Sequence, residues 1–108
     1  MVFIFVFTSA AQAHNCLAKV HSVDVAASGS IQVNLAGMGD GNALCSLNSV
    51  HGEFTAEACK AAFSLLLAAQ MSGKNVRIYF RNDSNTSCAK GSWIDYAAIG
   101  VYYIRVEN

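Results

Sequence analysis

Four cysteines are the residues of this chain whose types and spacing say most about chemistry. Cys16, Cys45, Cys59 and Cys88 contain no CxxC or CxH unit, the short spacing that supplies paired ligands to zinc. An even number of cysteines in a chain this small is typical of an exported domain that disulfides hold together. The sequence therefore predicts two disulfides, with zinc binding as the alternative, and four cysteines permit three pairings.

The other side chains with catalytic potential are scattered. The three histidines, His14, His21 and His51, have no second metal ligand at helical or strand spacing. Cys59 and His51 suggest a thiol nucleophile. In an exported chain with three further cysteines, however, we expect that thiol to be oxidised to a disulfide. The seven carboxylates cannot be paired from the sequence for glycosidase chemistry. We therefore expect no catalytic residue, no metal site and no cofactor.

Aromatic side chains near arginines are the remaining candidates for binding. Arg77 and Tyr79 share one face of a predicted strand, Arg81 follows that strand, and Trp93 comes directly after the polar loop 81–92. Exposed rings beside guanidinium groups form a stacking surface for a sugar or for a partner protein. The alternative is that these rings pack in the core and at sheet edges. Arg77, Tyr79, Arg81 and Trp93 are the predicted ligand-binding residues.

The first residues indicate export. Residues 1–7 are almost entirely hydrophobic, and the small residues Ala11 and Ala13 follow at the positions that a signal peptidase reads. We predict a signal peptide over 1–13 and a secreted or periplasmic protein, although the usual positive charge is absent. The alternative is that the segment is a strand of the fold, because Phe, Val and Ile favour strands. The run is too short for the roughly 20 residues that cross a bilayer.

Composition limits the partners. Lys and Arg together number seven, as do Asp and Glu, so the net charge is zero and argues against a nucleic-acid partner. The chain is 54% hydrophobic and only 13% charged. One small domain over 14–108 cannot easily cover so much apolar surface. We therefore expect a homo-oligomer.

The hydrophobic pattern predicts five strands and one helix. Strands are expected at 17–25, 31–35, 43–47, 76–80 and 99–106, with the glycine-rich stretch 37–42 as a loop. The helix is expected at 56–72. The resulting order, β-β-β-α-β-β, is typical of the OB-fold, a five-stranded, partly open antiparallel barrel. The alternative is an open antiparallel sheet with the helix across one face.

The helix has clear ends. Thr55 is its expected N-cap and Gly73 its left-handed stop. Glu57, Lys60 and Ser64 form a narrow polar stripe, and we expect every other face of the helix to be buried, with Phe63 and Leu66 in the core.

The fold also favours one disulfide pairing. The first and fourth strands of an OB barrel are antiparallel neighbours, which places Cys16 near Cys88. Cys45 would then pair with Cys59, joining the third strand to the helix. The other two pairings remain open at this stage.

Several stretches resemble known families: residues 45–47 (CSL), 63–66 (FSLL), 68–69 (AA) and 72–79 (SGKNVRIY). With its four cysteines, the chain resembles a broad group of small secreted bacterial proteins. It is more distantly similar to the B subunits of subtilase-type and typhoid-type AB5 toxins. The toxin resemblance implies an OB-fold, pentamers and binding of sialylated glycans. We thus expect an exported, non-enzymatic binding or interaction module, or alternatively a glycan-binding, oligomeric B-subunit-like lectin.

Overall fold

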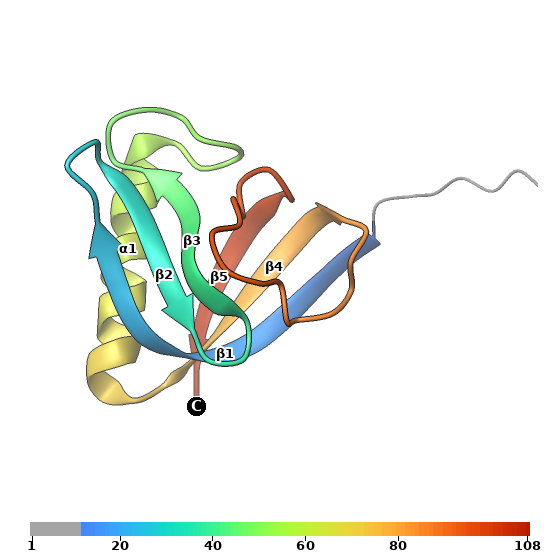
Figure 1. Cartoon of the computed structure of the whole chain (residues 1–108). Helices are drawn as coiled ribbons and strands as arrows, with labels where there is room; N and C mark the ends of the chain where they lie inside the picture. Colours follow the sequence, from blue (N-terminus) through green and yellow to red (C-terminus); the bar gives the residue numbers. More distant parts are fainter. Residues whose placement is uncertain (1–11) are drawn as a thin grey trace, which may run out of the picture.

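Five antiparallel strands form a single sheet in the computed structural model of the chain, and one helix packs against it (Figure 1). The structure describes residues 12–108. In chain order the elements are β1 (Gln12–Val25), β2 (Ser30–Leu35), β3 (Gly39–Ser46), α1 (Ala56–Ser72), β4 (Asn75–Asp83) and β5 (Val101–Glu107). The sheet order is β3-β2-β1-β4-β5, and the sheet is not closed between β3 and β5. The expected order of strands and helix, and the mostly β class, are confirmed.

β1 is the long central strand of the sheet. Its first part pairs with β4, from Gln12 opposite Asp83 to Lys19 opposite Asn75, and its last part pairs with β2. The strand therefore begins earlier than the sequence pattern predicted. Residues 1–11 of the predicted signal peptide lie outside the described residues, and the predicted cleavage point after Ala13 falls at the start of β1.

The core lies inside the curl of the sheet. Inward-facing residues alternate along the strands, as in Ile31, Val33 and Leu35 of β2. The largest buried side chains are Tyr96, Phe80, Ile31, Leu35, Leu44, Leu66 and Ile78. Alternation in β4 turns the residues between its buried positions outward, to the opposite face of the sheet.

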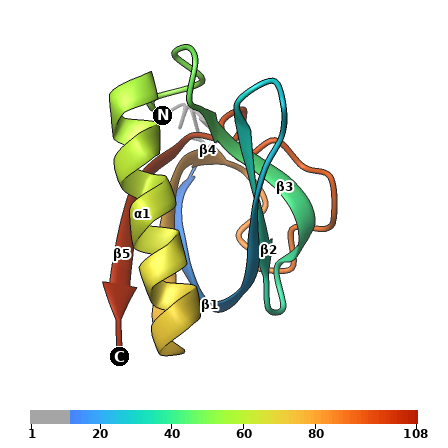
Figure 2. The same cartoon turned by 90° about the vertical axis from the view of Figure 1, so that its left-hand side faces the viewer.

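The helix has the predicted ends but less burial than predicted. The Thr55 hydroxyl accepts a hydrogen bond from the Ala58 amide, and Gly73 ends α1 in the left-handed conformation at φ 69°. The expectation that α1 is buried except for its polar stripe is wrong, because Leu65 is 41% exposed and Met71 is 86% exposed. In the described part of the chain, α1 contacts the sheet on one side and no second layer covers its other side (Figure 2).

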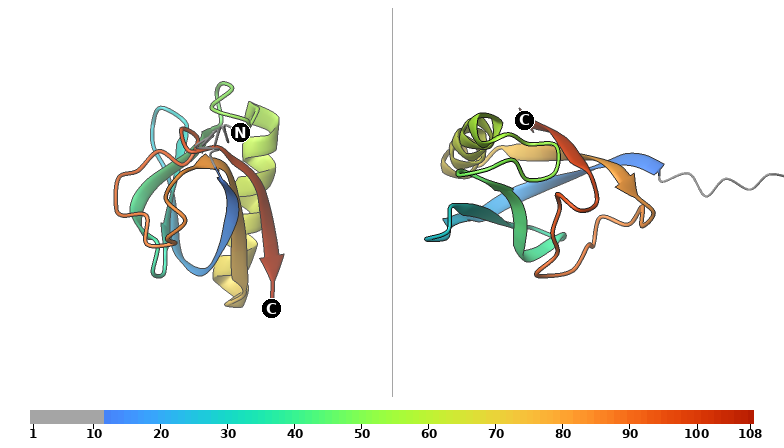
Figure 3. Two further views of the ribbon diagram at one scale, coloured as in Figure 1. Left: turned by 90° about the vertical axis from the view of Figure 1, so that its right-hand side faces the viewer. Right: turned by 90° about the horizontal axis from the view of Figure 1, so that it is seen from above.

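The predicted glycine-rich loop is partly strand. Gly39 to Asn42 belong to β3, and they have neighbours on both sides. On one side lies β2, and on the other the connection between β4 and β5 runs along β3 (Figure 3). A Cβ atom on Gly39 would lie 2.0 Å from the Gly91 carbonyl oxygen, so this approach requires a glycine.

Backbone hydrogen bonds fix this connecting segment on β3. Gly91 donates to the carbonyl of Met38 at 3.0 Å, and Trp93 donates to that of Asp40 at 2.9 Å. Ala43 of β3 in turn donates to Ile94 at 2.9 Å. Residues 91–96 therefore occupy the outer edge of β3 as an additional short strand would.

Two disulfides complete the fold. Cys16 of β1 is bonded to Cys88 in the β4–β5 connection, and Cys45 of β3 is bonded to Cys59 of α1. This is the pairing that the strand order favoured, and it is compatible with an extracellular or periplasmic protein. Among residues 12–108, no helix is long and apolar enough to cross a membrane.

Candidate binding site

Three of the four predicted ligand-binding residues lie in β4. Val76, Ile78 and Phe80 are fully buried, so Arg77 and Tyr79 point to the opposite, outer side of the sheet. Arg81 follows at the exposed end of the same row. We call the outer surface formed by Arg77, Tyr79, Arg81, Tyr102, Tyr103 and Arg105 the tyrosine–arginine face.

The strand register brings three tyrosines together. Tyr79 lies opposite Tyr103, and a bulge follows, because the next residue, Phe80, pairs with Val101. Tyr102 is the extra residue of this bulge. Its ring lies 6.1 Å from that of Tyr79, and the Tyr103 ring lies 5.2 Å from Tyr79, both in edge-to-face geometry. Alternation along β5 alone would place Tyr102 on one face with Ile104 and Val106, because the sequence does not reveal a bulge.

Two arginines lie over these rings. The guanidinium carbon of Arg81 is 4.2 Å from the centre of the Tyr102 ring, within the range of a cation–π interaction. Arg105 lies 5.6 Å from the Tyr79 ring centre and 5.9 Å from that of Tyr103. Sequence reasoning missed Arg105, although its position two residues after Tyr103 would reveal it once β5 is aligned with β4.

The three arginines differ in how fully they are already engaged. Arg77 binds Glu107 through Nη2 at 2.8 Å and Nε at 3.2 Å, and it also donates to Asn15 at 2.6 Å. This hydrogen-bonded pair raises the pKa of Arg77 and lowers the pKa of Glu107. Arg81 binds Glu53 at 3.0 Å. Among the described residues, the only ion pair of Arg105 is with Glu107 at 3.8 Å, and its side chain is 51% exposed.

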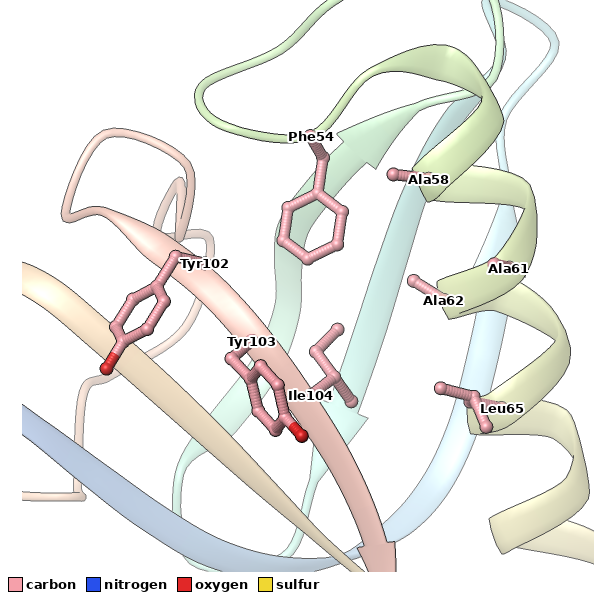
Figure 4. A pocket seen from close by; sticks show the side chains of 8 residues that line it. All are labelled: Phe54, Ala58, Ala61, Ala62, Leu65, Tyr102, Tyr103 and Ile104. Atoms are coloured by element: carbon pink, nitrogen blue, oxygen red, sulfur yellow. The ribbon is translucent and has the colours of Figure 1, made fainter.

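An apolar groove of about 210 Å³ lies beside the tyrosine–arginine face, between α1 and β5 (Figure 4). Ala62 and Leu65 of α1 point toward β5, whereas Tyr102 points away from the helix. The lining residues are Phe54, Ala58, Ala61, Ala62, Leu65, Tyr102, Tyr103 and Ile104. The groove is thus next to the open edge of the sheet.

Trp93, the fourth predicted binding residue, lies elsewhere. It is in the β4–β5 connection, and its indole ring covers Gly41 of β3. β3 is at the opposite end of the sheet order from β5. The structure therefore divides the four predicted residues between two surfaces.

Ionic groups elsewhere hold the long connection in place. The Lys90 ammonium lies 2.6 Å from Asp83 and 2.8 Å from His14, and its side chain is 2% exposed. His51 lies 3.1 Å from Asp95, which joins the turn before α1 to the same connection. Among residues 12–108, no three His, Cys, Asp or Glu side chains gather closely enough to hold a metal ion. These contacts account for His14 and His51 as structural residues.

Comparisons of the chain with protein-family models, curated proteins and solved structures gave no match. The functional argument therefore depends on the geometry of the two surfaces.

Proposed function

We propose that this protein is an exported, non-enzymatic binding module that recognises carboxylate-bearing ligands on the tyrosine–arginine face. Arg105 carries the proposal. Its guanidinium group is half-exposed and lies near two tyrosine rings, and the contact with Glu107 at 3.8 Å is its only ion pair within residues 12–108, so most of its donors are available there. Arginine binds carboxylates with paired, charge-assisted hydrogen bonds, and tyrosine and arginine are enriched where proteins bind partners.

The carboxylate can come from an acidic glycan or from an acidic peptide, and a titration followed by NMR separates these sources. The probes are 3′-sialyllactose and a glutamate-rich peptide, with lactose and a lysine-rich peptide as uncharged and oppositely charged controls. We expect saturable shifts at Tyr79, Tyr103 and Arg105 with at least one acidic probe. Saturation with neither acidic probe contradicts the proposal.

Variants test whether Arg105 is responsible. Arg105→Ala should weaken binding of the acidic probe by about tenfold or more, because a hydrogen bond to a charged group is worth roughly 1.5–3 kcal/mol. The matched control is Lys60→Ala, which removes an exposed cation of α1 that pairs with Glu57 on the same helix. Equal affinities for the two variants would show that the positive charge of Arg105 has no specific role.

A glycan-binding, oligomeric B-subunit-like lectin is the second candidate. The strand order β3-β2-β1-β4-β5, with the helix between β3 and β4, supports an OB-fold. The open edge of β5 and the apolar groove beside it offer backbone and side-chain surface for a second copy. Sedimentation of the oxidised protein at micromolar concentration tests this candidate, and a monomer that binds only the acidic peptide contradicts it.

A further inference from the structure

Trp93 has an unusual backbone conformation. Its φ of 63° is the only positive φ of a non-glycine residue within 12–108. L-residues with large side chains rarely adopt this region, and they remain there only where surrounding contacts enforce it. Here the Trp93 amide donates to Asp40 at 2.9 Å, and the Ile94 amide donates to the Asn42 side chain at 2.7 Å.

A buried amide side chain fixes both flanks of Trp93. Asn42 is fully buried, and its NH₂ group donates to the Gly91 carbonyl at 3.0 Å and to the Tyr96 hydroxyl at 2.8 Å. Its carbonyl accepts from Ile94, so one side chain contacts the segment before and after Trp93. Burial raises the pKa of Tyr96 to about 12, so this hydroxyl stays protonated at neutral pH. The Trp93 backbone is therefore held rigidly.

The indole ring has one covered side and a large exposed surface. A Cβ atom on Gly41 would lie 2.5 Å from Cζ3 and 2.6 Å from Cε3 of Trp93, so the ring rests directly on the glycine backbone. Nevertheless, 77% of Trp93 is exposed. A tryptophan held in an uncommon conformation, with so little of it buried, contributes little to the core. Its placement fits a ligand that stacks on the open side of the ring.

The neighbouring groups indicate the class of ligand. Asp40 is exposed in β3 next to Gly41, the residue that the ring covers, and its amide donates at 3.1 Å to the hydroxyl of Ser92, the residue before Trp93, which leaves the hydroxyl proton for another acceptor. A carboxylate and a hydroxyl match the hydroxyl groups of a sugar, and the carboxylate repels phosphates and acidic ligands. The nearby cation of Lys90 is already bound to Asp83. A ligand that is an uncharged ring with one apolar side and polar edges can contact the indole, the carboxylate and the hydroxyl together.

We propose that Trp93 is the stacking surface of a second binding site, which takes a pyranose ring of a neutral saccharide with Asp40 and Ser92 as hydrogen-bonding partners. This inference goes beyond the proposed function, because the site lies on β3 and the β4–β5 connection and not on the tyrosine–arginine face. The two sites have opposite charge preferences.

Trp93 is the only tryptophan of the chain, so its fluorescence reports on this site directly. The oxidised protein is titrated with lactose, maltose, cellobiose and N,N′-diacetylchitobiose. We expect at least one of them to change the emission saturably, with a Kd of about 1 mM or lower. If none reaches half-saturation at about ten times that concentration, the inference is wrong.

Variants separate this site from the tyrosine–arginine face. Trp93→Gly keeps the positive φ accessible and removes the ring, so calorimetry should detect at least about a tenfold loss of sugar affinity in a folded protein. Trp93→Phe should keep part of the affinity, and Arg105→Ala should leave it unchanged. Sugar binding that survives Trp93→Gly, or is lost in Arg105→Ala, overturns the inference. Loss of acidic-probe binding alone concerns only the proposed function.

Discussion

Leu65 and Leu66 are adjacent leucines of α1 with opposite environments, so they test which side of the helix is buried. Leu66 is 0% exposed and Leu65 is 41% exposed. Leu66→Ala removes apolar contacts and leaves a cavity, which costs about 2–5 kcal/mol of unfolding free energy. Leu65→Ala removes a side chain that is open to solvent through the groove, so no closed cavity remains, and the cost should be about 1 kcal/mol.

Chemical denaturation of the oxidised protein measures both costs, and thermal unfolding gives an independent check. In a domain of this size each kcal/mol lowers Tm by about 4–8 °C, so Leu66→Ala should lower it by roughly 10 °C or more. Lys60→Ala, on the polar side of the helix, is the control and should change little. If Leu65→Ala and Leu66→Ala had the same midpoint, α1 would not pack as described.

Three further predictions concern the backbone, a salt bridge and the disulfides. In denaturant, the free energy of unfolding of Trp93→Gly should exceed that of Trp93→Ala by about 1 kcal/mol, because glycine adopts a positive φ without strain. Equal free energies of unfolding would show that the fold does not impose the positive φ at residue 93. The lowered pKa of Glu107 means that its pair with Arg77 stabilises the fold above the ordinary Glu pKa of about 4.3 and is lost as pH falls through the lowered value. The stability difference between the native chain and Glu107→Gln should therefore disappear in acid, and a pH-independent difference contradicts this. The disulfides span 72 and 14 residues, so the chain-entropy relation predicts losses of about 4.4 and about 3 kcal/mol when each cysteine pair is replaced by alanine. If urea unfolding gave the larger loss of stability for the Cys45–Cys59 pair, the stabilisation by these disulfides would not come from chain entropy.

Local signals explain the part of the fold that the sequence predicts. The hydroxyl of Thr55 and the flexible backbone of Gly73 act within a few residues, and they give the ends of the helix correctly. Alternation identifies the strands for the same reason. The start of β1 and the strand character of Gly39 to Asn42 depend on pairing with β4, β2 and the 91–96 segment, which are distant in sequence. Local propensity does not contain this information.

In the candidate sites, too, local patterns predict some residues, and contacts between distant segments determine the others. Arg77 and Tyr79 share a face because alternation within one strand places them there. Arg105 joins them only through the register of β5, and Tyr102 only through a bulge. Trp93 was grouped with the arginines because it follows them in the chain. In the structure, the buried Asn42 side chain binds Gly91 and Ile94 and so holds Trp93 against β3. The sequence does not indicate this role of Asn42, because a polar residue in a glycine-rich stretch is typical of a loop.

The covered edge of β3 restricts the symmetry of any assembly that forms by strand pairing. Residues 91–96 take up backbone groups of Met38, just before β3, and of Asp40 and Ala43 in β3, whereas no strand among residues 12–108 pairs with the outer edge of β5. A ring of subunits joined head to tail by strands needs two different free edges on each copy. Pairing through the β5 edge alone joins it to the same edge of another copy, which produces a closed two-fold dimer. A ring of five would have to be held by side-chain surfaces instead.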